Sequence, residues 1–514
     1  MKLKVRLLNI HAGGKNIAIL DNETAGLLGV LSSDRVSVAY KGRKILAIVN
    51  IDADFPRNCI GLYEEISKLF ELENDQAVEV KPAEKPESLG YVQAKIRGER
   101  LRDEDMKAIV KDVVERHLSD IELASFVTAL HIRGVSMNEI LALSKAMIET
   151  GKTLKLNKSP ILDKHSIGGM PGDKASILLV PIIAAAGLII PKTSSRAVTS
   201  PAGTADRVEN LCPVNLTIEE MSKVIDRTNG CLVWGGALEL APADDLFIQI
   251  EYPLGIDPLL LPSIMSKKKA IGATHMVIDI PTGRGTKIKT IGEAHVLASD
   301  FIDLGKNFGI NVQCAITFGE QPLGYAVGPA LEAREALSAI MGNGPNDLIT
   351  KAVSLAGILF EMVGVRNGIK TAQRILDSGK AEKKLREIIE AQGGNPKLSP
   401  EDIKIGEKKA EVPTDQDGRI FWINNEGIAL IAREAGAPKE KGSGVVLKAK
   451  LGDFVRKGDV LFEIYSERNT KLEAALKLAE KLQPMGARAK LEDRMLIDRI
   501  PTRIVHKKAF AMER

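Results

Sequence analysis

The sequence predicts a multidomain α/β protein with a small β-rich N-terminal domain, a helical lobe, a large α/β lobe with a central sheet, and a C-terminal α+β domain. Three observations predict this class. The chain has 514 residues, too many for one ordinary hydrophobic core. Both ends contain short runs of alternating apolar and polar residues, which are typical of half-buried strands. The middle passes from helical periodicity to alternating strand-like and helical stretches, which is typical of an α/β sheet.

The composition is that of a soluble globular protein, with 44% apolar and 27% charged residues. The net charge of +4 gives no indication of a nucleic-acid binder, although it suits a small anionic substrate. The N-terminus lacks the apolar segment of a signal peptide, and the most apolar stretch, residues 177–191, predicts a buried helix too short to span a bilayer. We therefore expect a cytoplasmic protein without nucleic-acid or membrane partners.

The four cysteines are widely spaced and form no CxxC pair. Neither a disulfide framework nor a zinc site is expected, which again suits a reducing compartment.

Residues 1–84 form the first predicted domain, because glycines and Asp or Asn residues punctuate their short alternating runs. Residues 81–89 combine two prolines with charge and little apolar content, and we interpret them as a linker.

The helical lobe is expected over residues 85–164, with a further contribution from about 242–272. Ser119 or Asp120 can cap a helix that ends at Gly134, and Ser136 opens a second helix that ends at Gly151. In the first of these helices, the spacing places Phe126, Val127 and Leu130 on one face, which indicates a packed lobe.

The α/β lobe is expected over residues 165–241 and 273–425, with strands at 276–283 and 309–319 that end in glycine-bearing loops. Ligands of such sheets lie beyond the strand ends. Residues 426–514 form the last predicted domain. Within it, residues 442–466 have the strand–turn–strand rhythm of a biotinyl or lipoyl hammerhead without its modified lysine, which favours a structural or oligomerisation role.

Residues 163–176, DKHSIGGMPGDKAS, contain the clearest candidate for an anion site. Their three glycines let consecutive N–H groups approach an oxyanion, and an apolar helix follows. Lys164 adds a compact charge, while Ser166 and Ser176 add hydroxyl donors. A plain turn before a helix would have the same pattern.

Residues 194–209 form a second hydroxyl-rich segment between two apolar runs. Small hydroxyl residues there suit an oxyanion that must be bound and released, although a solvated loop is the alternative. This segment resembles the signature of the thymidine/pyrimidine nucleoside phosphorylase superfamily. The matching positions are Ser194, Arg196, Ala197, Val198, Ala202, Gly203, Thr204, Asp206, Val208 and Glu209.

Two further segments resemble that superfamily, namely DKHSIGG at 163–169 and SIMSKK at 263–268. The resemblance spans roughly residues 90–500 and implies a cleft between the two lobes that closes on substrate. It implies that Lys164, Ser166, Ser176, Ser194 and Thr204 line a phosphate site. The other substrate-binding residues it implies are Gly168, His165, Ser195, Arg196, Ala197, Val198, Thr199, Ser263, Lys267 and Lys287. For His165, simple packing in the cleft wall is the alternative.

The departures from the superfamily concern the base. Pyrimidine-specific members carry an arginine seven residues before an aspartate, whereas Ile250 stands seven residues before Asp257 here. Met170 and Pro171 make the glycine-rich turn one residue longer, and the stretch between Asp257 and Ser263 is two residues shorter. Together with the extra N-terminal domain, these departures resemble the archaeal AMP phosphorylases.

That resemblance implies that Asp257 is the catalytic general acid, which protonates the leaving base. Asp257 is also a credible helix N-cap, because Pro258 follows it at the first helical position. Lys287 follows a strand and a glycine-rich turn, so it is a candidate for the nucleotide 5′-phosphate or base, or a solvated loop lysine.

The expected activity is therefore phosphorolysis of a nucleoside 5′-monophosphate, with AMP and phosphate giving adenine and ribose 1,5-bisphosphate, and with CMP and UMP as further candidates. The alternative is a pyrimidine nucleoside phosphorylase. A phosphoribosyltransferase, which would need Mg²⁺, and a non-catalytic scaffold are weaker options. No cofactor or metal is expected, phosphate is a co-substrate, and the expected partners are small-molecule substrates and further copies of the chain in a homo-oligomer.

Overall fold

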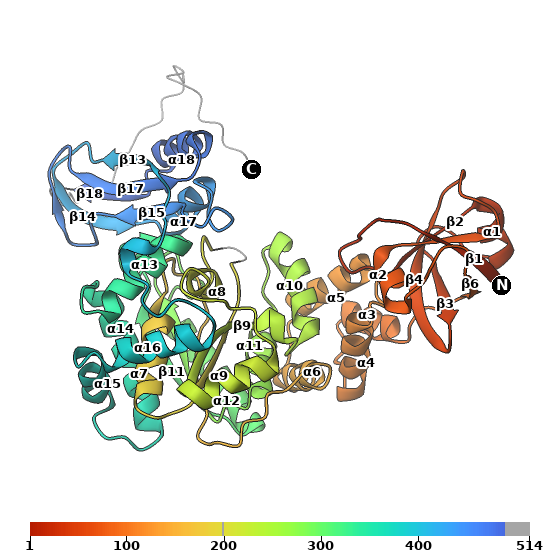
Figure 1. Cartoon of the computed structure of the whole chain (residues 1–514), viewed down its shortest axis with the longest axis horizontal. Helices are drawn as coiled ribbons and strands as arrows, with labels where there is room; N and C mark the ends of the chain where they lie inside the picture. The colour runs from red at the N-terminus through yellow and green to blue at the C-terminus, as the bar shows by residue number, and fades with distance from the viewer. Residues whose placement is uncertain (198–199, 489–514) are drawn as a thin grey trace.

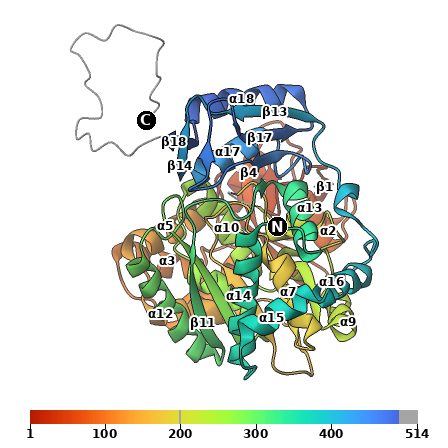
Figure 2. The same cartoon turned by 90° about the vertical axis from the view of Figure 1, so that its left-hand side faces the viewer.

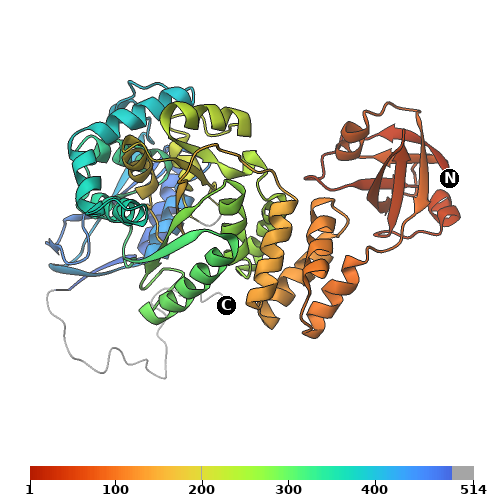
Figure 3. The same cartoon turned by 90° about the horizontal axis from the view of Figure 1, so that it is seen from below.

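The molecule is elongated, and its four parts follow one another in space (Figure 1). The computed structural model describes residues 1–197 and 200–488. The helical lobe lies between the N-terminal barrel and the α/β lobe, and the C-terminal domain covers one end of the α/β lobe (Figures 1 and 3). Viewed from the side of the α/β lobe, the barrel lies behind it (Figure 2).

The N-terminal domain is a closed barrel with the strand order β1-β5-β2-β4-β3-β6. Its strands are β1 (Lys2–Leu7), β2 (Ile17–Leu20), β3 (Arg35–Tyr40), β4 (Arg43–Ile51), β5 (Cys59–Leu62) and β6 (Ala77–Pro82), and its short helices are α1 (Asn22–Leu28) and α2 (Glu64–Phe70). Alternate side chains of each strand point into the barrel and fill its interior. In β1, for example, Leu3 and Val5 are buried while Lys4 is exposed. The predicted β-rich module is confirmed.

The connection from the barrel to the helical lobe is shorter than the expected linker 81–89, because β6 runs to Pro82 and the next helix begins at Ser88. The barrel also contacts the lobe directly. Arg35 forms an ion pair with Glu122, and its Nε donates a hydrogen bond to the main-chain oxygen of His117 at 2.9 Å.

The helical lobe consists of four consecutive helices and two that return later in the chain. They are α3 (Ser88–Arg97), α4 (Asp103–Val114), α5 (Asp120–Arg133), α6 (Met137–Glu149), α10 (Pro242–Leu254) and α11 (Leu260–Ala270). Both predicted helices are confirmed, with Ser119 and Ser136 as N-caps. Phe126 of α5 packs against Phe247 of α10 with ring centroids 6.2 Å apart, so the returning helix α10 shares the core of the lobe.

The sheet of the α/β lobe contains only parallel pairs, in the orders β11-β10-β7 and β8-β9. A parallel bridge between Ile161 and Ile189 joins the two groups. The strands are β7 (Leu162–Ser166), β8 (Ile190–Ser194), β9 (Gly230–Trp234), β10 (His275–Thr282) and β11 (Asn311–Phe318). The two strands predicted at 276–283 and 309–319 are confirmed as β10 and β11.

Helices cover this sheet on both faces, with α7 and α14 on one side and α12 on the other (Figure 1). The helices of the lobe are α7 (Ala175–Ala185), α8 (Thr204–Val208), α9 (Ile218–Thr228), α12 (Ile291–Phe308), α13 (Pro329–Ile340), α14 (Asn346–Met362), α15 (Gly368–Asp377) and α16 (Lys380–Ala391), with the 3-10 turns η1 (Gly235–Leu238) and η2 (Pro400–Asp402). The apolar stretch 177–191 is only partly the expected buried helix, because α7 ends at Ala185 and β8 begins at Ile190.

The C-terminal domain contains two antiparallel sheets, β12-β15-β17-β13 and β16-β14-β18. Its elements are β12 (Ala326–Val327), β13 (Lys408–Pro413), β14 (Gly418–Ile423), α17 (Asn425–Glu434), β15 (Gly444–Leu447), β16 (Phe454–Val455), β17 (Val460–Ser466), α18 (Asn469–Leu482) and β18 (Met485–Arg488). Residues from Lys408 onward belong to this domain, because β13 pairs with β17, whereas the sequence analysis placed the boundary at residue 426. The earlier strand β12 joins the same sheet through β15. In the part of the chain that the structure describes, no helix is both long and apolar enough to cross a membrane.

Candidate active site

The candidate site lies at the carboxyl ends of the parallel strands, where the sequence analysis placed it. β7 ends at Ser166, its neighbour β8 at Ser194 and its other neighbour β10 at Thr282. Because parallel strands end at the same edge, the glycine-rich loop after β7 and the hydroxyl-rich loop after β8 lie at the same edge of the sheet as the loop that carries Lys287.

The glycine-rich loop has the backbone that an anion site requires. Gly168 and Gly169 have φ values of 81° and 88°, and Gly172 has a φ of 76°. These left-handed conformations favour glycine and turn neighbouring N–H groups in one direction. Gly169 also lies against Lys287, since a Cβ added to Gly169 would stand 2.7 Å from the Lys287 nitrogen. The loop after β7 and the loop after β10 are therefore in direct contact.

A buried network of two lysines and two aspartates lies beneath this loop. Lys164 Nζ is 3.4 Å from Asp173 Oδ2 and 3.6 Å from Asp279 Oδ2, and Lys351 Nζ is 2.8 Å from Asp279 Oδ2. Burial opposes ionisation of Asp173, but Lys164 and Lys351 outweigh burial and hold the pKa of this carboxyl well below its usual value. The network is electrically balanced, so Lys164 presents no unpaired charge to an anion here.

The hydroxyls predicted for the phosphate site lie around the same loop. Ser166 is half-buried at the end of β7, and Ser176 is buried in the first turn of α7. The first N–H of that helix, from Ala175, donates to Asp173 Oδ1 at 3.3 Å. The start of α7 therefore points toward the loop, as expected for an anion-binding helix terminus.

The loop after β8 is held by Asp206 and Arg196. Asp206 Oδ2 accepts hydrogen bonds from the N–H groups of Ala197 and Gly203 at 2.6 and 2.8 Å. Arg196 binds Glu209 at 2.7 Å, and its guanidinium carbon lies 4.9 Å from the centre of the Trp234 ring. The Arg196 side chain thus braces the loop rather than standing free for substrate.

Ser194, Ser195 and Thr204 border this braced loop. The Ser194 hydroxyl donates to the Val233 oxygen at 3.2 Å, Ser195 is exposed, and the Thr204 hydroxyl accepts from Arg207 at 3.2 Å. The predicted substrate-binding residues Val198 and Thr199 lie outside the described residues.

His165 carries a neutral imidazole at neutral pH. Burial and the ammonium groups of Lys268 and Lys192 lower its pKa well below the usual value. Its Nδ1 atom is buried without a hydrogen-bond partner. A neutral ring can contact a nucleoside, but it is a poor source of a proton.

The predicted base-contacting residues Ser263 and Lys267 lie on α11, in the helical lobe. Ser263 is half-buried, and Lys267 forms an ion pair with the buried Asp244 of α10. Burial alone would lower the pKa of Lys267, but Asp244 and Asp245 raise it. Lys267 is therefore a charged side chain that already has a partner.

Asp257 lies in the loop between α10 and α11 and reaches across to the other lobe. Its Oδ2 atom is 2.5 Å from Lys287 Nζ, and both side chains are about two-fifths exposed, at 41% and 43%. The helix-cap interpretation is wrong, because α11 begins at Leu260 with Leu259 at the N-cap position. Residues 258 and 259 form a turn instead, which leaves the Asp257 carboxylate free to bind Lys287.

Glu251 is a buried carboxyl of the site that the sequence analysis missed. Only 6% of the residue is exposed, and Oε1 accepts the Leu259 N–H at 3.1 Å. Burial is the largest cause and the neighbouring Asp257 the second in raising the pKa of Glu251 to about 8. No sequence signal marks this residue, because a glutamate on a helix is ordinarily solvated.

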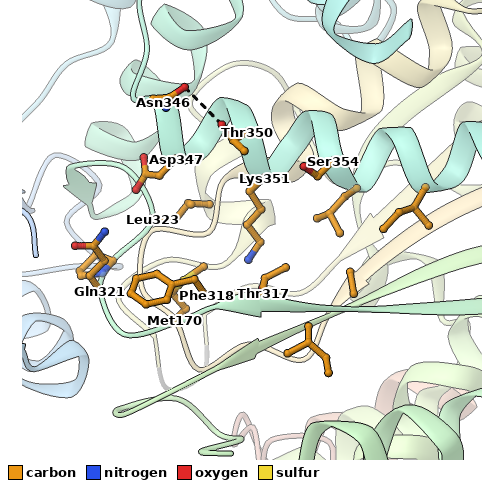
Figure 4. A pocket seen from close by; sticks show the side chains of 15 residues that line it. Met170, Thr317, Phe318, Gln321, Leu323, Asn346, Asp347, Thr350, Lys351 and Ser354 are labelled. Carbon is orange, nitrogen blue, oxygen red and sulfur yellow. Dashed lines mark hydrogen bonds between the residues drawn. The ribbon is translucent and has the colours of Figure 1, made fainter. Parts of the chain in front are cut away.

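A cavity lies beside the glycine-rich loop. It measures about 700 Å³, and Figure 4 shows it between α14 and the end of β11. Met170 of the glycine-rich loop and Lys351 of the buried network both line it, together with mainly apolar side chains. None of the predicted site residues lines this cavity. It is therefore adjacent to the candidate site but separate from it.

Three family models match the chain in the order of its domains. They are the helical bundle domain of the glycosyl transferase family at residues 90–151, the a/b domain of that family at 158–382, and the pyrimidine nucleoside phosphorylase C-terminal domain at 420–486. Among solved structures, an anthranilate phosphoribosyltransferase from Thermus thermophilus has a TM-score of 0.50. That alignment covers 59% of this chain and 98% of the other at 20% identity, and it therefore supports the fold alone.

Similarity to curated relatives extends over nearly the whole chain. The AMP phosphorylase of Thermofilum pendens is 50% identical over 97% of this chain and 98% of its own length. The AMP phosphorylase of Thermococcus kodakarensis is 48% identical over 94% and 97%, and that of Methanosarcina barkeri is 45% identical over 98% and 99%. The chain therefore belongs to the AMP phosphorylase family, a group of pentosyl-transferring phosphorylases within the glycosyl transferase family.

Proposed function

We propose that this enzyme cleaves AMP with phosphate to give adenine and ribose 1,5-bisphosphate. One observation carries the proposal beyond family membership. The glycine-rich anion loop contacts Lys287 through Gly169, and Lys287 binds Asp257 of the opposite lobe. Lys287 thus connects the proposed oxyanion site with the proposed proton donor, and phosphorolysis of a nucleotide requires both.

In the proposed reaction, a phosphate oxygen attacks C1′ while the C1′–N9 bond breaks. The N–H groups of Gly168, Gly169, Met170 and Gly172 and the hydroxyls of Ser166, Ser176, Ser194 and Thr204 hold the phosphate. The bonding electrons pass to the base, and Asp257 delivers a proton to a ring nitrogen so that adenine leaves neutral. Such general acid catalysis contributes about 10²–10⁴-fold.

Asp257 must carry a proton to act in this way, and in the structure its carboxyl is paired with Lys287. We infer that the nucleotide 5′-phosphate draws Lys287 away from Asp257. Loss of the ammonium group and exclusion of water on cleft closure both raise the pKa of a carboxyl. Lys287 would then serve as a 5′-phosphate ligand, while the neutral His165, Ser263 and Lys267 contact the nucleoside.

Phosphate is a co-substrate in this proposal, and the reaction uses no cofactor and no metal. A phosphoribosyltransferase would instead need Mg²⁺, so activity that persists in excess EDTA separates the two chemistries. We also propose that the enzyme works as a homo-oligomer, which light scattering on the eluting protein measures directly.

The deciding experiment incubates the enzyme and phosphate with each of AMP, CMP, UMP, adenosine, uridine and thymidine, and quantifies the free base. Phosphorus NMR identifies the sugar product. We expect AMP to have the highest kcat/KM, because Ile250 stands where pyrimidine-specific relatives have an arginine, and here it packs beside the helical-lobe core. Faster cleavage of thymidine would instead support the alternative, a pyrimidine nucleoside phosphorylase.

A further inference from the structure

The bridging segment, residues 322–326, leads from β11 into β12, and two lysines hold its main chain. Lys174 Nζ donates hydrogen bonds to two main-chain oxygens of the segment, at 2.7 and 3.0 Å. Lys450 Nζ donates to two more, one of them at 2.6 Å. The acceptors are the oxygens of Leu323 and Ala326 for Lys174, and of Pro322 and Gly324 for Lys450.

Two carboxylates balance these ammonium groups and hold the N–H groups of the same segment. Glu335 of α13 pairs with Lys174 at 2.6 Å, and Asp347 of α14 pairs with Lys450 at 3.0 Å. Each carboxylate also accepts a main-chain N–H of the bridging segment, at 2.9 and 3.1 Å respectively. Both lysines are buried, with 0% and 8% of each residue exposed. Because charged hydrogen bonds are strong in buried surroundings, these contacts fix the segment firmly.

The bridging segment lies directly against the glycine-rich loop of the proposed phosphate site. The Leu323 N–H donates to the Pro171 oxygen at 3.1 Å, and Lys174 Nζ donates to the Gly172 oxygen at 3.0 Å. A Cβ added to Gly172 would stand 2.7 Å from the Leu323 oxygen, so the two backbones are in contact. A displacement of the segment would therefore displace the loop.

Lys450 brings the C-terminal domain into this arrangement. The domain contacts the segment through β15, which pairs with β12, and through the Leu447 N–H, which donates to the Tyr325 oxygen at 2.9 Å. A cavity of about 700 Å³ borders Leu323 and Asp347 (Figure 4). Because a cavity offers no packed atoms, the position of the segment on that side depends on its hydrogen bonds.

We propose that Lys450 is a positioning residue of the phosphate site, through which the C-terminal domain holds the bridging segment and the glycine-rich loop in an anion-binding conformation. This inference rests on the proposed function, which identifies the anion as phosphate. Lys450 acts through main-chain oxygens of the segment rather than through contact with phosphate. Without its ammonium group, two main-chain oxygens lose a donor and Asp347 loses its cation, which is unfavourable in buried surroundings. The segment would then move toward water, and Gly172 would move with it.

The test measures the Kd of inorganic phosphate by isothermal titration calorimetry on the full chain, in the wild type and in Lys450→Met. Methionine has a similar length but offers no hydrogen-bond donor. We expect the Kd to rise about tenfold or more, because hydrogen bonds to an anion weaken steeply when their N–H groups turn away from it. The KM for phosphate at saturating AMP should rise by a similar factor.

Two control variants of the same domain separate positioning from a general loss of stability. Lys448→Met removes an exposed lysine that pairs with Glu463 at 3.0 Å, and it should bind phosphate as the wild type does. Ile431→Ala truncates a buried side chain in the core of the domain, so it should lower the Tm without changing the Kd. If Lys450→Met lowers the Tm but binds phosphate with the wild-type Kd, its role is structural alone and the proposal is overturned.

Asp347→Asn is a second variant, which keeps the proposal testable if Lys450→Met does not fold. Its amide oxygen can still accept the Gly324 N–H, but the charge that holds Lys450 is lost. The Kd should rise by a smaller factor than in Lys450→Met, and an unchanged Kd contradicts the proposal. These measurements need no turnover. A wild type that binds phosphate but releases no adenine contradicts the proposed function alone, whereas a wild type that binds no phosphate contradicts both.

Discussion

Replacing Asp257 by Asn separates the catalytic role of this residue from its structural contacts. The amide retains the size of the side chain but cannot donate a carboxyl proton. The lost ion pair with Lys287 is exposed on both sides, so its loss should cost at most about 1 kcal/mol of folding stability. If proton donation is the role of Asp257, kcat should fall about 10²–10⁴-fold.

The assay measures adenine release at saturating AMP and phosphate, together with the melting temperature. The KM for phosphate should stay near the wild-type value, because Asp257 lies in the other lobe from the phosphate loop. Asp303→Asn is a matched control, since Asp303 on α12 also forms an exposed lysine pair, with Lys306 at 3.0 Å. It should change neither kcat nor Tm appreciably.

A near-normal kcat in Asp257→Asn, with a normal melting temperature, would refute the general-acid assignment. A helix-cap role could not explain that result, because Leu259 rather than Asp257 occupies the N-cap of α11. His165 would be a weak substitute, since its lowered pKa keeps the ring neutral. The alkaline limb of the kcat–pH profile, set by loss of the donated proton, should also disappear from the residual activity of the variant.

Three further predictions follow from the same geometry. Ser194→Ala and Thr204→Ala should each raise the KM for phosphate about ten- to a hundredfold, because a hydrogen bond to an anion contributes about 1.5–3 kcal/mol; an unchanged KM removes the residue from the site. Lys351→Met should lower the free energy of unfolding by about 3–5 kcal/mol, because it leaves buried Asp279 short of a cation, whereas exposed Lys370→Met should have little effect. Deletion of residues 1–84 should leave a folded core, which circular dichroism measures. The deletion removes the ion pair of Arg35 with Glu122 on α5, but Ser119 still caps that helix.

Local signals in the sequence predicted the elements that depend on local chemistry. Ser119 and Ser136 cap their helices through bonds to N–H groups three residues away, so the pattern and the structure report the same contact. The glycines of the loop after β7 likewise adopt the positive φ values that their positions in the sequence predict. These features lie within a few residues of the signals that predict them.

The apolar stretch 177–191 shows where such signals fail. A continuous apolar run has no periodicity that distinguishes a buried helix from a buried strand. The run contains both, since α7 ends at Ala185 and β8 begins at Ile190. The predicted boundary of the C-terminal domain differs from the structure for a related reason. Only the pairing of β13 with β17 assigns β13 to that domain, and no local sequence signal reports this pairing.

The electrostatics of the site were not predictable from spacing. Lys351 and Lys164 share the same two aspartates although 187 positions separate them in the numbering. The motif therefore indicated Lys164 as a phosphate ligand without revealing its neutralising partners. Glu251 is a second case. Its raised pKa results from burial and from the charge of Asp257, and only the fold produces these surroundings.

Four of the lysines in and around the site are paired with four aspartates. The groups are Lys164 and Lys351 with Asp173 and Asp279, Lys267 with Asp244, and Lys287 with Asp257. The proposed phosphate site therefore relies on N–H and hydroxyl donors, which suits a product that must leave with two phosphate groups. Among these four lysines, Lys287 has the most exposed side chain, at 43%, and its pair crosses between the lobes. It is the cation best placed to exchange its aspartate for a 5′-phosphate.

This exchange predicts how the enzyme distinguishes AMP from adenosine. Adenosine has no 5′-phosphate, so on this proposal Lys287 remains paired with Asp257 even when the nucleoside is bound. The penalty should therefore appear in kcat at saturating substrate, by about 10²-fold or more, and not only in KM. In Lys287→Met the Asp257 carboxyl has no ammonium partner, so the ratio of kcat for AMP to kcat for adenosine should shrink. Equal kcat values for the two substrates in the wild type would show that the 5′-phosphate contributes binding alone, and that Lys287 does not control the acid.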